Sequence, residues 1–163
     1  MLPLRLSAGI TSLLPGRDRM AIVIEYTVLA DGRTRPGEIY PALVRNHAKL
    51  VYEEVGDWLA GSGPVPGTVG ETPGLAEQVA LQHEAAMRMK KRRTEQGALA
   101  LETIEAEPVV EGNRVMALVI HEQNLARCLI EEFMVAANGT LTAFLAAAGL
   151  PMIHRVVRTP RNW

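Results

Sequence analysis

The feature that most constrains the fold is the last long apolar segment, "QNLARCLIEEFMVAANGTLTAFLAAAG", which covers residues 123 to 149. Its apolar residues recur with the 3.6-residue period of a helix that buries one side. Gly149 and then Pro151 end the segment, because glycine readily adopts the left-handed conformation after a helix and proline cannot continue one. The pattern therefore predicts one long helix over these residues.

Two further helices are predicted earlier in the chain. Residues 49 to 61, "KLVYEEVGDWLAG", carry apolar side chains at i, i+4, i+7 and i+8, which form one face of a helix. A longer helix is predicted from Thr72, or a neighbour, as N-cap to a stop at Gly97. The expected core contacts are Val51, Val55, Trp58 and Leu59 in the first of these helices and Leu75, Val79, Ala86 and Met87 in the second.

A first β-hairpin is predicted where β-branched residues are followed by a turn dipeptide. The strand within residues 20 to 32 ends in Asp31-Gly32, and a return strand covers about 37 to 44. Pro41 is expected to end the return strand early or to place it at a sheet edge, because proline cannot donate a hydrogen bond to a ladder.

A second hairpin is predicted over residues 108 to 122, with its turn at Gly112-Asn113. Between the first two helices, residues 61 to 74 are rich in glycine and proline and are expected to form a mobile loop. The resulting order of elements predicts an α+β fold of antiparallel hairpins packed with three helices, in one domain that spans residues 1–163.

Composition excludes some classes of function. The 17 Lys and Arg residues nearly balance the 18 Asp and Glu residues, so whole-chain charge does not indicate a nucleic-acid or membrane binder, and only a local patch could. Cys128 is the only cysteine, which fits a reducing cytoplasm better than secretion. The N-terminus is a poor signal peptide, and no apolar run reaches the roughly 18 residues of a membrane span. We expect a cytoplasmic protein that does not bind a membrane.

Ligands for a metal ion are dispersed along the sequence. The four histidines never occur in a metal-binding spacing, and more than ten residues separate each of the three aspartates from the next. Two-metal hydrolysis of phosphodiesters needs carboxylates clustered around both ions. We therefore expect no metal site and no catalytic residue in this chain. The four histidines are His47, His83, His121 and His154, and the three aspartates are Asp18, Asp31 and Asp57.

The run "RMKKRR", residues 88 to 93, is the one strong local charge. It lies at the C-terminal end of a predicted helix, where cations complement the macrodipole in any case. Two interpretations stay open: a solvated helix end, or a patch that contacts phosphate through residues such as Arg92 and Arg93.

The last helix has a polar side as well. Its predicted apolar stripe is Ile130, Phe133, Met134 and Ala137. Asn124, Glu131 and Asn138 share another face, where a carboxylate and an amide can hydrogen-bond a ribose or a backbone. Glu131 and Glu132 can equally be ordinary surface charges.

In the first helix, Tyr52 precedes Gly56 by one turn. Glycine inside a helix costs about 1 kcal/mol relative to alanine, so Gly56 requires a reason. One interpretation is that Gly56 leaves the phenol face open for a ligand, and the other is that the ring folds over the glycine as a packing contact.

Several of these stretches together resemble one family. The segments "RNHAKLVYEEVGDWL" (45 to 59), "RRTEQGALALE" (92 to 102) and "ARCLIEEFMVAANGTLTAFLAAAGLP" (126 to 151) follow the order and spacing of the central part of the RNB catalytic domain of ribonuclease II and ribonuclease R. The segment from 2 to 24 resembles the stretch just upstream of that central part. The sequence around Tyr52 is more similar to ribonuclease II than to ribonuclease R.

The resemblance implies a processive 3′-to-5′ exoribonuclease domain that degrades single-stranded RNA with Mg²⁺ held by aspartates. By position, Tyr52 matches the family tyrosine that contacts RNA, and Glu131, or else Glu132, matches a glutamate that helps to recognise ribose. The predicted RNA-binding residues are therefore Tyr52, Glu131, Arg92 and Arg93.

The chain also departs from the family pattern. The aspartate cluster and a downstream arginine motif have no counterpart, an aspartate is missing near Ala100, and Arg127 and Cys128 replace a histidine and an arginine. We also expect no flanking cold-shock or S1 domain. The expectation is an internal fragment of the nuclease domain that is inactive alone and binds no Mg²⁺, with the rest of that domain or another chain as a partner. The alternatives are an RNA-binding remnant without catalysis and an interaction domain.

Overall fold

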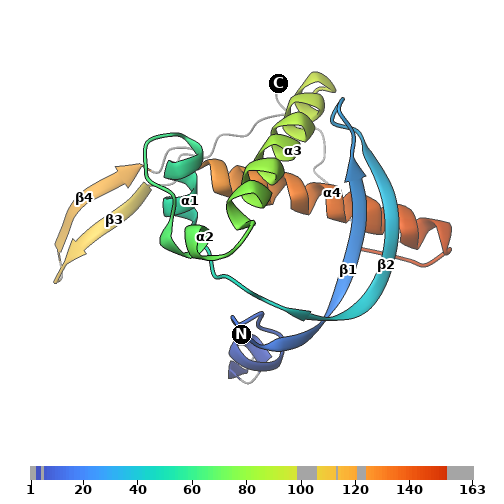
Figure 1. The fold of residues 1–163 in the computed structure, drawn as a ribbon, viewed down its shortest axis with the longest axis horizontal. Coiled ribbons are helices and arrows are strands. Elements are labelled where there is room, and N and C mark those ends of the chain that lie inside the picture. Colours follow the sequence, from blue (N-terminus) through green and yellow to red (C-terminus); the bar gives the residue numbers. More distant parts are fainter. Residues whose placement is uncertain (1–2, 5, 99–105, 113, 121–123, 154–163) are drawn as a thin grey trace.

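The computed structural model describes residues 3–4, 6–98, 106–112, 114–120 and 124–153. A long curved β-hairpin arches beside a group of helices, and a second, shorter hairpin projects from the opposite side of that group (Figure 1). The arrangement is α+β, as predicted. In chain order the elements are η1 (Leu6–Ile10), β1 (Asp18–Val28), β2 (Thr34–Arg45), α1 (Tyr52–Leu59), α2 (Gly67–Glu71), α3 (Leu75–Glu95), β3 (Ala106–Glu111), β4 (Arg114–Ile120) and α4 (Leu125–Ala147).

The turn of the first hairpin forms at Asp31-Gly32, as the sequence predicts. The Asp31 carboxylate accepts the backbone N–H of Arg33 at 3.0 Å, and Gly32 has a φ of 79°. A Cβ built on Gly32 would lie 2.3 Å from the carbonyl oxygen of Arg88 in α3. Glycine is therefore required here twice, for its left-handed conformation and for the close approach of the turn to α3.

Strands β1 and β2 pair antiparallel from Asp18↔Arg45 to Val28↔Thr34, with an irregularity between Ile24 and Tyr26. β1 begins two residues earlier than the predicted strand and ends at Val28, and β2 is longer than the predicted 37 to 44. Pro41 does not end β2, which continues to Arg45 with Pro41 opposite Ile22. The strand tolerates this proline because β2 pairs only with β1 among the described strands, so one of its sides needs no ladder donor.

The main core lies between the helices. Val55 of α1, Val69 of α2, Val79 of α3 and Ala126 of α4 form one buried cluster, and half-buried side chains pack against it. Val69 is only 1% exposed, although it lies in the segment predicted as a loop. Residues 67 to 71 of that segment form α2, whereas its mobility stays a prediction. The half-buried side chains are Trp58, Leu59, Leu75 and Ala76.

The buried side of α4 differs from the predicted stripe. Leu129 and Glu132 are buried, whereas Ile130 and Met134 are 40% and 60% exposed. The buried side is therefore rotated by about one residue, or about 100°. The physical reason is that α4 packs against both α1 and α3. In the same way, Met89 of α3 is buried where Met87 was expected.

Helix α4 begins and ends close to the predicted residues. Asn124 is its N-cap, and Gly149 adopts a φ of 68° just after its last turn. Within the described part of the chain, α4 is the helix that is long and apolar enough to cross a membrane by length and composition. α4 contacts α1, α3 and β1, and 28% of its apolar window is buried in the structure.

The second predicted hairpin is confirmed as an antiparallel pair of strands. Strands β3 and β4 pair antiparallel around Gly112, whose φ is 62°. Asn113 and the end of the predicted hairpin at residues 121 and 122 lie outside the described residues.

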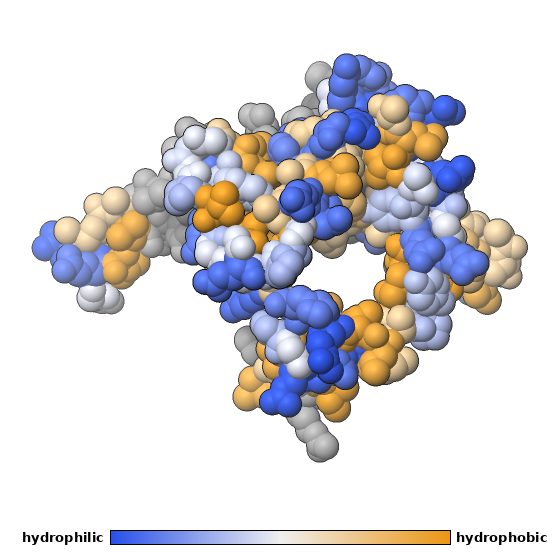
Figure 2. Space-filling model, viewed as in Figure 1, coloured by the Kyte–Doolittle hydropathy of each residue, from blue (hydrophilic) through white to orange (hydrophobic). Residues whose placement is uncertain are grey.

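Apolar side chains remain on the surface over the N-terminal segment and the first hairpin (Figure 2). Met20, Ile22 and Leu43 are 64% to 70% exposed and belong to β1 and β2. This part of the molecule contrasts with the covered core between the helices.

Candidate functional site

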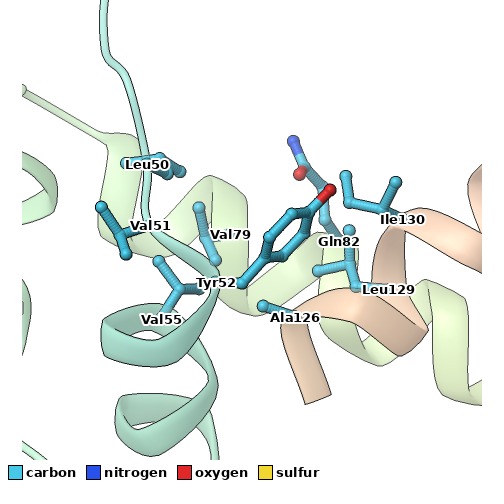
Figure 3. Close-up of a pocket in the computed structure, with 9 residues that line it drawn as sticks. All are labelled: Leu50, Val51, Tyr52, Val55, Val79, Gln82, Ala126, Leu129 and Ile130. Atoms are coloured by element: carbon cyan, nitrogen blue, oxygen red, sulfur yellow. The ribbon is translucent and has the colours of Figure 1, made fainter. Parts of the chain in front are cut away.

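Tyr52 is the first residue of α1, and its side chain lines a small pocket where α1, α3 and α4 meet. The pocket has a volume of about 180 Å³ and mostly apolar walls. Tyr52 is 45% exposed, and its phenol oxygen points toward Gln82 of α3 and Ile130 of α4 (Figure 3). The ring thus forms one wall that solvent and a ligand can reach. The complete lining is Leu50, Val51, Tyr52, Val55, Val79, Gln82, Ala126, Leu129 and Ile130.

Asn124 connects Tyr52 to α4. Its side-chain oxygen accepts the backbone N–H groups of Ala126 at 2.9 Å and Arg127 at 3.2 Å, which caps the helix. Its side-chain nitrogen donates to the carbonyl oxygen of Tyr52 at 2.8 Å. The predicted face shared by Asn124, Glu131 and Asn138 is therefore wrong for Asn124, because its amide is used at the helix start.

The structure shows a reason for glycine at position 56 that the two sequence interpretations did not include. A Cβ at this position would lie 2.3 Å from the side-chain nitrogen of Asn124, and all three of the nearest atoms belong to that amide. Gly56 is buried as well. Glycine therefore allows α1 and the Asn124 amide to approach each other, and the two interpretations that concern the Tyr52 ring stay predictions.

Arg127 covers part of the Tyr52 ring. Its guanidinium carbon lies 5.6 Å from the ring centroid, within the range of a cation–π contact. The same guanidinium donates to the Glu53 carboxylate at 3.1 Å. One side of the tyrosine is thus backed by a cation, and that cation is itself held in place.

A second polar site lies farther along α4. Arg93 of α3 donates to Glu132 at 2.5 Å and to Glu131 at 3.2 Å. The Glu132 side chain is 2% exposed and the Glu131 side chain is 62% exposed. The hydrogen bond with Glu132, and then the nearby carboxylate charges, raise the pKa of Arg93 above its usual range. We call these three residues the Arg93 cluster.

The structure therefore separates the predicted RNA-binding residues into two places. It brings Arg93 and Glu131 together, and it places Tyr52 at the other site with no described contact to either. Arg92 is half-buried and lines a wider hollow beside Arg93, Glu132 and the first hairpin turn. Arg88 pairs with Glu84 one turn earlier, so the basic run does not form a single open stripe.

Sequence reasoning did not connect three residues, Asn124, Gln82 and Arg127, with Tyr52. Asn124 carries a signal for its capping role, since asparagine just before a helical pattern is a preferred N-cap. Gln82 and Arg127 carry no such signal, because helices distant in sequence bring them to Tyr52. His121 and His154 lie outside the described residues, and so does Ala100, near which the family pattern has an aspartate.

The donor set for a metal ion is incomplete in the described ranges. No group of three His, Cys, Asp or Glu residues is close enough to hold an ion there. Asp18 binds Arg45 at 2.6 Å and Asp31 binds Arg33 at 2.6 Å, and hydrogen bonds to these partners lower the pKa of both carboxyls. Cys128 is buried in helix packing. These residues do not fit a Mg²⁺ site, so no catalytic step through a metal is assigned to them.

Comparison with known proteins gives the class. The family model described as "RNB domain" matches residues 1–163. The chain belongs to the RNB domain family.

The relatives include ribonuclease R of Thermotoga maritima, which is 33% identical over 162 residues, and ribonuclease R of Escherichia coli, which is 32% identical over 161 residues. Exoribonuclease 2 of Buchnera aphidicola is 30% identical over 148 residues. The matches cover 98%, 98% and 90% of this chain and 22%, 19% and 22% of those proteins. The chain thus spans about a fifth of their length, and the similar identities do not separate the ribonuclease R branch from the exoribonuclease 2 branch.

Solved structures show the same fold. Ribonuclease R of Mycoplasma genitalium in complex with ribose-methylated single-stranded RNA has a TM-score of 0.80 at 23% identity, over 91% of this chain and 22% of that one. The same enzyme in complex with double-stranded RNA has a TM-score of 0.81 at 23% identity, over 91% of this chain and 26% of that one. The predicted fold, a part of an RNB-type domain, is confirmed.

Proposed function

We propose that this chain supplies an RNA-contacting part of an RNB-type 3′-to-5′ exoribonuclease that hydrolyses single-stranded RNA. The observation that carries the proposal is the family match over the whole chain. The relatives named ribonuclease R and exoribonuclease 2, and the ribonuclease R structure in complex with single-stranded RNA, support it.

The Tyr52 site has the chemistry that single-stranded RNA requires. Proteins recognise unpaired nucleotides by stacking them on aromatic rings and by hydrogen bonds to base edges and 2′-hydroxyls. Tyr52 offers a half-exposed ring above an apolar pocket, and the Gln82 amide at the same pocket has both a donor and an acceptor. We assign the nucleotide contact to this site.

Glu131 is the second contact that we propose. Its carboxylate is 62% exposed and can accept a hydrogen bond from a ribose 2′-hydroxyl, whereas Glu132 is 2% exposed and faces Arg93. Arg93 orients both carboxylates. Arg92 and the exposed Lys91 at the end of α3 are better placed to meet phosphate, because Arg93 is already bound to two carboxylates.

Hydrolysis is proposed to depend on groups beyond the described residues. RNB enzymes use Mg²⁺, which activates water and stabilises the charge that develops on the phosphodiester. The carboxylates described above do not cluster for that task. The residues of this chain are proposed to bind and orient the RNA, and not to hold the ion.

The test is a pair of measurements on the 163-residue chain. Fluorescence anisotropy at about 50 mM salt compares a labelled single-stranded RNA with the same sequence as DNA, and a denaturing gel follows the RNA with Mg²⁺ present. We expect RNA to bind more tightly than DNA and to remain full length. Absence of RNA binding at this salt concentration contradicts the proposed role, and shortening of the RNA contradicts the assignment of metal binding to other groups.

An interaction domain is the second candidate, because a specific surface favours it. Met20, Ile22 and Leu43 expose apolar side chains on the first hairpin. Such a surface is typical of a contact with another polypeptide. This candidate predicts no binding of single-stranded RNA, so the same anisotropy measurement distinguishes the two functions.

A further inference from the structure

We propose that Asn124 is a positioning residue whose amide fixes Tyr52 to the start of α4, so that the phenol ring keeps the orientation in which a nucleotide contacts it. This inference rests on the RNA-binding role proposed for Tyr52. It adds a residue that touches no RNA and acts through the tyrosine.

The Asn124 amide is bonded at both ends. Its oxygen accepts from the backbone of Ala126 and Arg127, and its nitrogen donates to the Tyr52 carbonyl at 2.8 Å. One planar group therefore joins the first turn of α4 to the first residue of α1. Residues 52 and 124 are far apart in sequence, so this bond sets how the two helices begin relative to each other.

The opposite helix is shaped to receive this amide. The nitrogen, carbon and oxygen atoms of the amide lie 2.3 to 2.6 Å from the position that a Cβ of Gly56 would occupy. Any side chain at residue 56 would push the amide away from the Tyr52 carbonyl. A glycine in the middle of a helix weakens it relative to alanine. In α1 this loss of helix stability occurs at the residue that lies against the Asn124 amide.

Capping alone does not require asparagine. An N-cap needs only a side-chain oxygen, and aspartate caps a helix about as well as asparagine. Aspartate would also complement the positive end of the helix dipole. What asparagine adds is the NH₂ donor, and Asn124 uses that donor on Tyr52. The donor is therefore the feature that a positioning role explains and a capping role does not.

The same junction also fixes the cation behind the ring. Arg127 is one of the two residues whose backbone N–H is capped by Asn124, and its guanidinium lies 5.6 Å from the Tyr52 ring centroid. Because Arg127 of α4 also binds Glu53 of α1, the guanidinium is held in place relative to the Tyr52 ring. A nucleotide can then stack only on the part of the ring that Arg127 leaves open.

The decisive variant is Asn124→Asp, which keeps the capping oxygen and removes the donor. The ring signals of ¹³C-labelled tyrosine, assigned with Tyr52→Phe, report the position of Tyr52 by NMR, and fluorescence anisotropy reports the affinity for single-stranded RNA. We expect a slightly lower melting temperature, because the hydrogen bond between α1 and α4 is lost, together with shifted Tyr52 ring signals and an affinity about fivefold lower.

Gly56→Ala provides an independent variant if Asn124→Asp does not fold. Alanine favours the helix but occupies the space of the Asn124 amide, so the same shift of the Tyr52 signals and the same loss of affinity are expected. In an Asn124→Ala background the amide is absent, and Gly56→Ala should then change neither readout further. Non-additive effects of the two substitutions would show that residues 56 and 124 interact directly.

The outcomes separate the two proposals. Shifted Tyr52 signals together with weaker RNA binding support the positioning role. If either readout equals that of the wild-type chain, Asn124 is only a cap and the inference is overturned. If the wild-type chain itself does not bind single-stranded RNA, the proposed function fails, and the Tyr52 ring signals alone decide whether Asn124 positions the tyrosine.

Discussion

At the start of α4 the polar side chains hold a half-exposed tyrosine, whereas in the middle of the same helix they surround a buried carboxylate. Asn124 and Arg127 bond to or lie over Tyr52 and leave part of its ring accessible. In the Arg93 cluster, one guanidinium meets two carboxylates, so Arg93 and the buried Glu132 are bonded to each other, whereas the exposed Glu131 still has acceptor capacity for a ligand. The comparison teaches that charge alone does not identify a ligand site. A ligand requires groups whose bonding capacity is still open.

The largest expected effect concerns the stability of the Arg93 cluster. Arg93→Ala leaves the Glu132 carboxylate, which is 2% exposed, without its ion pair. Removing one partner of a buried pair costs about 3–5 kcal/mol, and the partial exposure of Arg93 reduces this to about 2–4 kcal/mol. Urea denaturation followed by circular dichroism measures the loss.

Two controls sharpen this prediction. Glu131→Gln removes the exposed partner and should cost less than about 1 kcal/mol. Adding Glu132→Gln to Arg93→Ala removes the unpaired charge and should recover part of the stability. An Arg93→Ala protein as stable as the wild type would mean that the cluster does not contribute to folding, and the contrast between the two sites would be lost.

The next effect is on RNA affinity at the Tyr52 site. Tyr52→Ala should weaken binding of single-stranded RNA by about tenfold, because stacking of a base on an aromatic ring contributes about 1–3 kcal/mol. Tyr40→Ala is the matched control, since Tyr40 is 37% exposed and lies on β2. Equal losses in the two variants, measured by anisotropy, would show that Tyr52 has no special role.

A smaller effect is expected in the salt dependence of RNA binding. Lys91→Gln should lower the slope of log affinity against log salt by about 0.7, the value for one phosphate contact of a single strand. Arg93→Gln should leave the slope unchanged at a temperature where the variant is folded, because its charge is bound to two carboxylates. A reduced slope in Arg93→Gln would instead indicate that RNA displaces the carboxylates.

The smallest effect is a loss of stability at alkaline pH. Tyr26 of β1 donates to the Phe133 carbonyl in the middle of α4 at 3.3 Å, and burial raises the pKa of Tyr26 above 10.0. A raised folded-state pKa means that this contribution is complete below pH 10.0 and is lost as the pH rises through the folded-state value. Melting temperatures between neutral and alkaline pH should therefore fall more for the wild type than for Tyr26→Phe. Parallel curves for the two proteins would contradict this prediction.

Local sequence predicted the elements because their signals are local. Asp31-Gly32 turns the first hairpin through its own carboxylate and a left-handed glycine. Gly149 ends α4 in the same way. These residues act through their own backbone and neighbours within a few positions, so no tertiary contact is needed to locate them.

The faces of the helices could not be predicted as well as the helices themselves. Of the predicted apolar stripe, Ile130 and Met134 are exposed, while Glu132 outside it is buried, because packing against α1 and α3 decides which side of α4 is covered. A charged residue on the buried side carries no hydrophobic signal, and its partner Arg93 lies 39 positions away. Val69 was missed for the reverse reason, since the glycines and prolines around it indicate a loop.

The sequence by itself determined the α+β order of elements, the family, and Tyr52 as the residue of interest. Only the tertiary structure decided what surrounds Tyr52. Gly56 is a glycine because Asn124, 68 positions later, needs its space, and the ring is backed by Arg127 from the same distant helix. A periodic pattern reports which residues can share a helix. It does not report which atom of another helix will meet them, because that depends on how the helices pack.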